Sequence, residues 1–363
     1  MRFETYSLGE LVSIKYGKNQ KKVLSKNGAF PIYGTGGLMG YATKALYDKP
    51  SVLIGRKGTI EKIRYVNHPF WTVDTLFYTI VNDNIVIPQF LYYAMLQLDL
   101  LQYNEGTTIP SLRTETLNRI ELRIPNIDNQ KRILHYLATI DEKIELNTKI
   151  NENLEQQARA LFKKMISGDQ KQVPFTSLID VFGGGTPKTG NQEYWNGEIP
   201  FFTPKDVGNP YALTTEKSIT SLALDNCNSH LYPVNTVFLT ARGTVGKVSL
   251  AGIPMAMNQS CYALTGKDGL HQIIVYQYVL ETVKALKHKA SGAVFDAIIT
   301  RDFDTEIIPV LSSEQIDDYI AVAAPIYSEI RNRTFENQRL AAIRDTLLPK
   351  LMNGEIDVSE VQI

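Results

Sequence analysis

The 363-residue chain is 44% hydrophobic and 21% charged, which is enough for more than one sizeable core, so we expect at least two domains. Its net charge is zero and does not by itself point to a polyanionic partner. The first residues lack an apolar signal core, and no run of about eighteen apolar residues occurs, which argues against secretion and membrane spanning. The sequence predicts a cytoplasmic protein with no membrane contact.

The two halves of the chain repeat each other with a period of about 185 residues. Residues 52–63, VLIGRKGTIEKI, align with residues 237–248, VFLTARGTVGKV. In both copies an apolar strand runs into a Gly-Thr turn beside a basic residue. Gly106 of the first copy aligns with Gly292 of the second. The repeat predicts two related globular domains.

The first predicted domain, residues 1–125, carries more basic than acidic residues. Five lysines stand close together near its start: Lys15, Lys18, Lys21, Lys22 and Lys26. Taken alone, this run fits a solvated loop as well as it fits contact with phosphates. Residues 311–363, by contrast, carry more acidic than basic residues.

A long helical pattern follows Pro125 and covers residues 126–168. Seam residues recur at alternating spacings of four and three over about five heptads, as in a coiled coil. The seam positions are Ile133, Leu137, Ile140, Ile144, Asn147, Asn151, Leu154, Ala158, Leu161 and Met165. Asn151 and its counterpart Asn337 are polar seam residues, which usually fix helix register; a water-bridged layer with no special role is the alternative.

The second predicted domain, residues 169–311, leads into a second helical pattern over residues 312–354, and residues 355–363 form a C-terminal tail. This second seam is a poorer copy of the first: Tyr319, Ala323, Ile326, Ile330, Arg333, Asn337, Leu340, Arg344, Leu347 and Leu351. Ser312 and Gln315 are placed as a capping box at its start. Pro325 and Pro349 lie inside it and predict a kink near the first proline and a break near the second.

Because each helix follows a related domain in one chain, we expect the two helices to pair with each other; an oligomerisation zipper is the alternative. The predicted fold class is α+β, with two similar mixed α/β domains separated by two long helices that form an intramolecular antiparallel coiled coil with pseudo-twofold symmetry. The residues predicted to pair the helices are Ile140, Ile144, Asn151, Leu154 and Leu161 of the first and Ile330, Asn337, Leu340 and Leu347 of the second.

Signals for catalysis are absent or incomplete. The run at residues 183–189, GGGTPKT, lacks the Gly-Lys-Ser/Thr ending of a phosphate loop, and Pro187 removes an amide that a phosphate cradle needs. The glycines of residues 34–40 do not have dinucleotide-binding spacing. Neither the two cysteines nor the five histidines have metal-ligand spacing. The sequence therefore predicts no catalytic residue, no metal ion and no cofactor.

Several short motifs nevertheless point together to one family. In the first half they are residues 31–37 (PIYGTGG), 40–41 (GY), 53–59 (LIGRKGT), 69–71 (PFW) and 130–133 (QKRI). In the second half they are residues 184–189 (GGTPKT), 193–197 (EYWNG), 199–201 (IPF), 203–206 (TPKD), 242–246 (RGTVG) and 347–352 (LLPKLM). With these motifs the chain resembles, over essentially its whole length, the specificity (S) subunit of type I restriction-modification systems. One departure is Glu61, which stands where the second copy has Gly246.

The resemblance implies a non-catalytic DNA-binding subunit. Each recognition domain would read one half of a split sequence in double-stranded DNA, and the paired helices would set the spacer. Two methyltransferase (M) subunits would dock around it to form a DNA adenine methyltransferase, and restriction and translocation (R) subunits would complete the endonuclease. The alternative is a coiled-coil interaction scaffold, such as an orphan regulatory subunit, that does not read a DNA sequence.

Both domains place basic and polar side chains on loops beside the Gly-Thr turns. Phosphate and sugar contacts make up at least half of protein–DNA hydrogen bonds, so contact with phosphate is favoured over a guanine for the basic residues. The residues predicted to contact DNA are Tyr33, Thr35, Arg56, Lys57, Thr59 and Lys62 in the first domain, and Thr186, Lys188, Thr203, Lys205, Arg242, Thr244 and Lys247 in the second.

Overall fold

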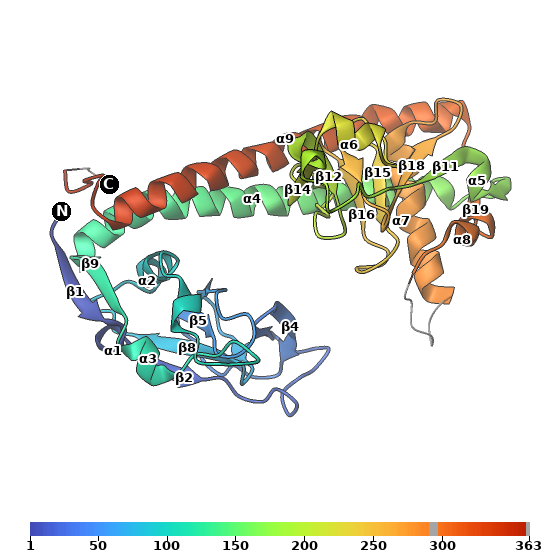
Figure 1. Ribbon diagram of the computed structural model, residues 1–363. Helices are drawn as coiled ribbons and strands as arrows, with labels where there is room; N and C mark the ends of the chain where they lie inside the picture. Colours follow the sequence, from blue (N-terminus) through green and yellow to red (C-terminus); the bar gives the residue numbers. More distant parts are fainter. Residues whose placement is uncertain (290–296, 361–363) are drawn as a thin grey trace. The chain divides into compact units, whose positions relative to one another are not determined.

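The computed structural model describes residues 1–289 and 297–360. The chain forms two compact units: unit 1 is Met1–Lys143 with Leu340–Ile363, and unit 2 is Ile144–Arg339. Each unit contains a globular β-rich part and a portion of two long helices, α4 (Ile127–Ile166) and α9 (Ser313–Met352), which Figure 1 labels. Within the described part of the chain, no helix is long and apolar enough to cross a membrane.

In the part of unit 1 that the structure describes there are three small sheets. The strand order of the largest is β2 (Val12–Tyr16), β8 (Leu76–Val81), β5 (Ser51–Gly55) and β6 (Arg64–Val66). A second has the order β4 (Gly37–Ala42), β3 (Phe30–Gly34) and β7 (Trp71–Thr72), and the third pairs β1 (Phe3–Ser7) with β9 (Glu121–Pro125). Its short helices are α1 (Leu8–Leu11), α2 (Pro88–Met95), η1 (Leu100–Tyr103) and α3 (Thr114–Asn118).

The described residues of unit 2 also form three sheets. The largest has the order β11 (Ile179–Gly183), β18 (Cys261–Gly266), β15 (Val237–Thr240), β16 (Val248–Ala251) and β13 (Tyr211–Ala212). The others are β14 (Lys217–Ile219), β12 (Trp195–Phe202) and β17 (Ala256–Met257), and the pair β10 (Gln172–Pro174) and β19 (Ile307–Pro309). Its helices are α5 (Phe175–Leu178), η2 (Gln192–Tyr194), α6 (Ser221–Asp225), α7 (Gln272–Lys289) and α8 (Thr300–Asp304).

The duplication predicted from the sequence is confirmed in the strand order. The sheet β2-β8-β5-β6 of unit 1 matches β11-β18-β15-β16 of unit 2, to which β13 adds one strand. Each unit also has a three-stranded sheet whose central strand pairs with a short parallel strand: β3 with β7, and β12 with β17. The extra strand β13 comes from residues 203–216, which separate β12 from β14. The corresponding connection in unit 1 is the tight turn between β3 and β4.

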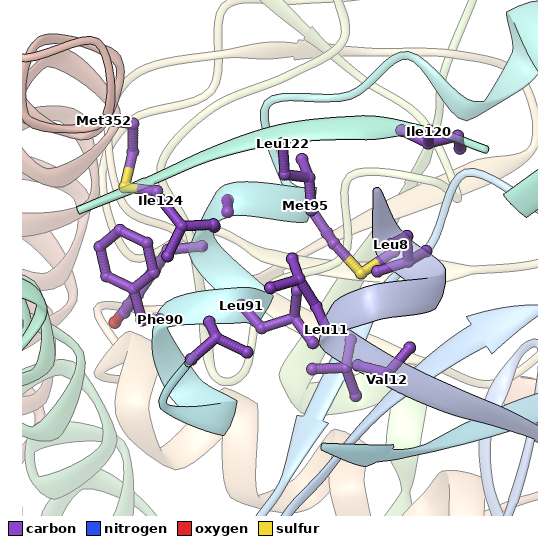
Figure 2. Close-up of a cluster of buried hydrophobic side chains, with 14 of the residues drawn as sticks. Leu8, Leu11, Val12, Phe90, Leu91, Met95, Ile120, Leu122, Ile124 and Met352 are labelled. Atoms are coloured by element: carbon purple, nitrogen blue, oxygen red, sulfur yellow. The ribbon is translucent and has the colours of Figure 1, made fainter. Parts of the chain in front are cut away.

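The core of unit 1 gathers apolar side chains from elements that are far apart in the sequence (Figure 2). Strand β9 alternates exposed and buried residues before its last two buried positions, so Leu122 and Ile124 face this core. Helix α2 packs against them, and Met352 at the end of α9 joins the same cluster. Burial of each large apolar side chain contributes about 1.5–3 kcal/mol, which holds the end of α9 against unit 1.

Within unit 2, polar side chains join α4 to α9. Asn147 is fully buried, and its amide donates to Asn337 Oδ1 at 2.9 Å. Arg333 donates to Asn147 Oδ1 at 2.9 Å, and Tyr319 donates to the Ala158 carbonyl at 3.2 Å. From Asn147 to Ala158 on α4, the hydrogen-bond partners on α9 run in the opposite direction, from Asn337 to Tyr319. This is the order expected of an antiparallel pair.

The two helices also meet within unit 1. Arg344 Nη1 donates to Asp141 Oδ1 at 2.8 Å, and the Tyr93 hydroxyl donates to the same carboxylate. The apolar residues of this contact belong to the unit 1 core: Ile133, Leu137, Leu348 and Leu351. The Arg344–Asp141 ion pair and these apolar contacts therefore both join α4 to α9 within unit 1.

The helix-pairing residues predicted from the heptad pattern differ in burial. Asn151 and Ile330 are buried, and the Asn151 amide donates to the Ile330 carbonyl at 3.4 Å. Other predicted residues are half-buried: Ile140, Ile144, Leu154, Asn337, Leu340 and Leu347. Leu161 is 43% exposed, whereas the adjacent Phe162 is fully buried. The α-helical repeat of 3.6 residues turns the buried face away from a strict heptad seam, so Phe162 takes the place predicted for Leu161.

The start of the second long helix agrees with the prediction, and its end does not. The capping box is confirmed, because Ser312 N donates to Gln315 Oε1 and Gln315 N donates to Ser312 Oγ. The predicted break near Pro349 is wrong, since α9 continues without interruption to Met352. A proline removes only one backbone donor, and burial of the flanking apolar side chains holds the final turn. The chain leaves the helix at Gly354, whose φ of 83° favours glycine.

His271 immediately precedes helix α7, and its ring accepts a hydrogen bond from the first turn of that helix. The Ile273 amide donates to His271 Nδ1 at 3.2 Å, which requires a neutral ring at that nitrogen. Burial lowers the pKa of His271 below its ordinary value of 6.5. The unfolded chain therefore takes up a proton at a higher pH than the folded chain does. The stability present above about pH 6.5 is lost as the pH falls below that value.

We expect His271→Asn to keep a capping side chain and to weaken the pH dependence of stability. The urea midpoint of this variant should fall less between pH 7 and pH 5 than the midpoint of the wild type. As a control, substitution of the exposed His230 by Asn should leave the wild-type pH dependence in place. An unchanged pH dependence in the His271 variant would show that this ring does not titrate with unfolding.

Candidate functional site

In unit 1 the Gly-Thr turn follows β5, and the residues that lead into the turn are hydrogen-bonded to a short segment at residues 72–75. Arg56 N and Lys57 N both donate to the Thr75 carbonyl, at 2.8 and 3.3 Å. The same loop receives Lys18 N at the Thr72 carbonyl (2.9 Å), and its Val73 N donates to the Tyr33 carbonyl (3.0 Å). Three segments predicted or noted from the sequence therefore converge on one loop, which we call the unit 1 hub loop.

Aromatic and basic side chains gather beside this hub loop. The Tyr33 hydroxyl lies 3.3 Å from His68 Nε2, and the Arg64 guanidinium lies over the Tyr33 ring, 5.3 Å from its centroid. Burial raises the pKa of the Tyr33 hydroxyl, so it stays protonated and can donate a hydrogen bond. A Cβ added at Gly58 would lie 3.8 Å from Thr35 Oγ1, which places the Gly-Thr turn against the tip of the β3–β4 hairpin.

The predicted DNA-contacting residues of unit 1 differ in the exposure of their side chains and in the contacts that these already make. Lys57 and Lys62 are exposed, and Thr35 and Thr59 are half-buried. Arg56 is already engaged, since its Nη1 donates to the Asp74 carbonyl at 3.0 Å and its guanidinium lies over the Tyr16 ring. Arg56 therefore supports the turn, whereas the two lysines can reach an external anion.

Sequence reasoning missed several residues of this surface. Arg64 and His68 join it through Tyr33, and neither belongs to the Gly-Thr motif. Leu38 and Met39 on β4 are 55% and 56% exposed, although both are large and apolar. An apolar side chain that stays exposed on such a surface has the chemistry to contact a thymine methyl group.

A second missed segment of unit 1 is the loop at residues 106–111. Gly58 N donates to the Pro110 carbonyl at 2.9 Å, so this loop lies directly beside the Gly-Thr turn. The loop exposes polar and apolar side chains: Thr107, Thr108 and Ile109. The alignment of Gly106 with Gly292 was the signal in the sequence that this loop recurs, and Gly292 lies outside the described residues.

Unit 2 has an equivalent hub loop at residues 258–260. Ala241 N and Arg242 N donate to the Ser260 carbonyl at 2.8 and 3.3 Å, and Asn258 N donates to the Phe202 carbonyl at 2.9 Å. The Thr186 hydroxyl is hydrogen-bonded to the Gln259 side chain. The unit 2 hub loop therefore joins the segments that hold three predicted residues, Thr186, Thr203 and Arg242. The sequence offered no signal for this loop, because the contacts that join it to these three segments are distant along the chain.

In each unit a glycine at an equivalent position packs closely against the backbone of the hub loop. A Cβ added at Gly17 would lie 2.0 Å from the Val73 carbonyl oxygen, and one added at Gly184 would lie 2.1 Å from the Asn258 carbonyl oxygen. Any other residue would force these backbones apart. The same steric requirement in both units supports a common geometry for the two surfaces.

Near the end of β12, the predicted residues of unit 2 are partly held by acidic side chains. Thr203 N and Oγ1 donate to Asp206 Oδ2 at 2.8 and 2.6 Å, so the threonine hydroxyl stabilises the turn. Lys205 Nζ lies 3.1 Å from Glu216 Oε2, but both side chains are largely exposed and such a pair contributes little. Thr244 Oγ1 donates to the Pro204 carbonyl at 3.4 Å, which brings the Gly-Thr turn to the same place.

The side chains of Lys188, Arg242 and Lys247 are exposed. Thr186 and Arg242 are hydrogen-bonded to the unit 2 hub loop, whereas no hydrogen bond joins Lys188 to that loop within the described residues. The surface therefore combines a fixed backbone with several cations that can move. That combination suits phosphate contact, because a lysine acts as a flexible point charge.

The departure at Glu61 has a structural explanation. In unit 2 the matching Gly246 has a φ of 73°, and a Cβ there would lie 2.5 Å from Lys287 Cε. Lys287 Nζ donates to the Gly246 carbonyl at 2.8 Å and so closes the turn. Glu61 is exposed and is not among the residues with positive φ. The two Gly-Thr turns are alike up to the threonine and differ after it.

The described part of the chain shows no group of three or more His, Cys, Asp and Glu side chains that could hold a metal ion. Burial, with a contribution from the Asp206 charge, raises the pKa of the Cys261 thiol to about 12. That thiol stays protonated at neutral pH and is not a nucleophile. What the geometry offers is a pair of surfaces built from backbone amides, hydroxyls and cations, which suits binding of a phosphate polymer.

Comparison with known proteins gives a family. A model of the type I restriction modification DNA specificity domain matches the chain twice, at residues 2–156 and 169–322. The type I restriction enzyme HindI specificity subunit of Haemophilus influenzae is 26% identical, over 79% of this chain and 81% of that protein. The EcoR124I/EcoR124II specificity subunit of Escherichia coli is 23% identical, over 72% of this chain and 72% of that protein.

A solved structure has a similar fold. The S subunit of a type I restriction-modification system from M. genitalium aligns with a TM-score of 0.61 at 17% identity, covering 99% of this chain and 97% of that one. The two family matches together cover most of the chain, and one falls on each copy of the repeat. The chain therefore belongs to the family of type I restriction-modification specificity subunits, with two DNA specificity domains.

Proposed function

We propose that each unit reads one half of a bipartite sequence in double-stranded DNA. The observation that carries this proposal is the repeated hub loop, which in each unit joins a Gly-Thr turn to the end of a central strand. Exposed basic side chains beside the turns contact phosphates and set the register. Polar and apolar side chains that differ between the units contact base edges. The two surfaces therefore share a frame and read different half-sites.

The predicted DNA-contacting residues have different roles on the two surfaces. Lys57, Lys62, Arg242 and Lys247 bind phosphates, because they are exposed and adjacent to the turns. Tyr33, with Arg64 above its ring, is placed to donate a hydrogen bond to a base or phosphate. The other predicted contacts are Thr35, Arg56, Thr59, Thr186, Lys188, Thr203, Lys205 and Thr244.

The two long helices set the spacer between the half-sites. The antiparallel contacts within unit 2, from Asn147 with Asn337 to Ala158 with Tyr319, support an intramolecular antiparallel coiled coil with pseudo-twofold symmetry. Pseudo-twofold symmetry matches the symmetry of a duplex, so similar faces meet half-sites about one helical turn apart. The domains then follow the sequence boundaries: recognition domains at residues 1–125 and 169–311, helices at 126–168 and 312–354, and a tail at 355–363.

The chain itself performs no chemical step and acts in the cytoplasm as part of a complex. Two methyltransferase subunits dock on it and methylate adenine, and restriction and translocation subunits complete the endonuclease. The competing function is a coiled-coil scaffold or orphan regulatory subunit that does not read sequence.

A gel shift with and without methyltransferase subunits separates the two functions. The specificity subunit predicts a complex that prefers DNA carrying its own motif, with affinity that falls as salt rises. Equal binding to motif and scrambled DNA at every salt concentration would favour the scaffold. Binding of methyltransferase subunits alone is common to both and does not distinguish them.

A further inference from the structure

Unit 2 contains a pocket of about 550 Å³ beside its Gly-Thr turn, lined in part by Gly246 and Lys247. Helix α7 packs against β16 here (Figure 1), and a few residues of α4 complete the wall. Its charged lining is mostly basic: Arg159, Lys247, Lys284, Lys287, His288 and Glu155. We call this set the basic pocket.

The single acidic side chain of the basic pocket is already occupied. Glu155 is buried, and its Oε1 accepts a hydrogen bond from the Tyr276 hydroxyl at 3.0 Å. Arg159 Nη1 lies 4.0 Å from the same oxygen. The ion pairs of the described residues involve none of Lys247, Lys284 and Lys287. The pocket therefore has more positive charge than its own carboxylate neutralises.

One of its cations is fixed in place. Lys287 donates to the Gly246 carbonyl at 2.8 Å, and a Cβ at residue 246 would lie 2.5 Å from Lys287 Cε, so a larger residue would displace this lysine side chain. Burial and the neighbouring charge of Lys247 lower the pKa of Lys287. Lys247 and Lys287 line the same pocket, so an anion bound between them would relieve the repulsion of their charges.

We propose that the basic pocket binds a backbone phosphate of the DNA strand that contacts the unit 2 Gly-Thr turn. This inference rests on the proposed function and adds cations of α7 and α4 to the phosphate contact already proposed for Lys247. Lys247 follows Thr244 by three residues, which span at most about 10 Å. Phosphates of one strand recur about every 3.4 Å along the helix axis, so a strand held at Thr244 reaches the pocket within two or three nucleotides.

The site is specific to unit 2. The Gly246 that admits Lys287 is replaced by Glu61 in unit 1, and a carboxylate at that place repels a phosphate. The pocket therefore gives the second half-site an additional electrostatic anchor. Because phosphates carry no sequence information, this anchor affects affinity and not the sequence that is read.

The test uses the chain assembled with its methyltransferase subunits and compares Lys284→Ala with Lys164→Ala. Both lysines are exposed and lie on helices of unit 2, but only Lys284 lines the pocket. Affinity for motif DNA is measured across a salt series. Loss of one phosphate contact should reduce the slope of log K against log salt by about 0.9 and weaken binding about fivefold at 0.15 M salt. Lys164→Ala should behave as the wild type, and the methylated motif should be the same in all three.

Other outcomes overturn the proposal. A wild-type slope in Lys284→Ala would show that the pocket takes no DNA phosphate. Inorganic pyrophosphate serves as a probe for free phosphate compounds. If it raises the melting temperature of the wild type but not of Lys284→Ala, while the DNA slope is unchanged, the pocket serves such compounds and the DNA assignment is wrong. Failure of the wild-type complex to prefer its motif would count against the proposed function, and the same titration shows this before any variant is compared.

Discussion

Exchange of residues 1–125 for the first domain of another specificity subunit is expected to change one half of the methylated motif and to leave the other half and the spacer unchanged. The reason is that the unit 1 surface is held by its own segments: the hub loop at residues 72–75 bonds to Lys18, Tyr33 and the Gly-Thr turn. The exchanged segment also keeps the β1–β9 pair intact, because both strands lie inside it. Single-molecule sequencing of the methylated genome reads the result.

The donor domain has to match the apolar core that it shares with the helices. Ile133, Leu348 and Met352 lie in the unit 1 core beside residues of the exchanged segment, so a donor with similar residues at Phe90 and Ile124 avoids a folding defect. The reciprocal exchange of residues 169–311 is the matched control and should alter only the other half of the motif. If either exchange changed both halves, the two domains would not read independently.

Phe162→Ala is expected to destabilise the protein by about 3–5 kcal/mol, whereas Leu161→Ala should cost less than about 1 kcal/mol. Phe162 is fully buried, with ring centroids 5.3 Å from Tyr278 and 5.5 Å from Tyr319, while the neighbouring Leu161 is 43% exposed. Truncation of the phenylalanine leaves a cavity among aromatic rings, and truncation of the leucine leaves none. Urea unfolding of both variants gives the free energies.

This pair also separates the observed helix face from a strict heptad seam. The seam predicted from sequence places Leu161 at the interface, and by that seam the larger loss would follow from Leu161→Ala. Equal losses would place both side chains in the interface. A larger loss for the leucine variant would contradict the burial described here.

Much of the architecture could be predicted because the sequence repeats the same pattern of motifs in its two halves. The repeated Gly-Thr turn and the prolines before the helices mark both domains, and α4 and α9 lie within one or two residues of the predicted helix spans. The break expected at Pro349 does not occur, because buried neighbours hold the last turn of α9. A proline signal is local and carries no information about the packing that opposes it.

The candidate DNA-binding surfaces were harder to predict than the arrangement of domains and helices. Residues next to a motif, such as Lys57 and Arg242, could be chosen from the sequence, but the hub loops could not. The hydrogen bonds that join them to the predicted residues link distant positions, from Lys57 with Thr75 to Thr186 with Gln259, and a pattern of neighbours cannot reveal them. Arg64 was missed for the same reason, since its position is defined by the ring of Tyr33 and not by a motif.

We propose that the two units read a split DNA sequence at a fixed separation. The most direct measurement is single-molecule methylation sequencing of DNA from cells that express this chain with its methyltransferase subunits and no other methyltransferase. The proposal predicts a single asymmetric motif of two short specific parts joined by a non-specific spacer of constant length. A continuous short motif, or methylation that depends on no sequence, would contradict it.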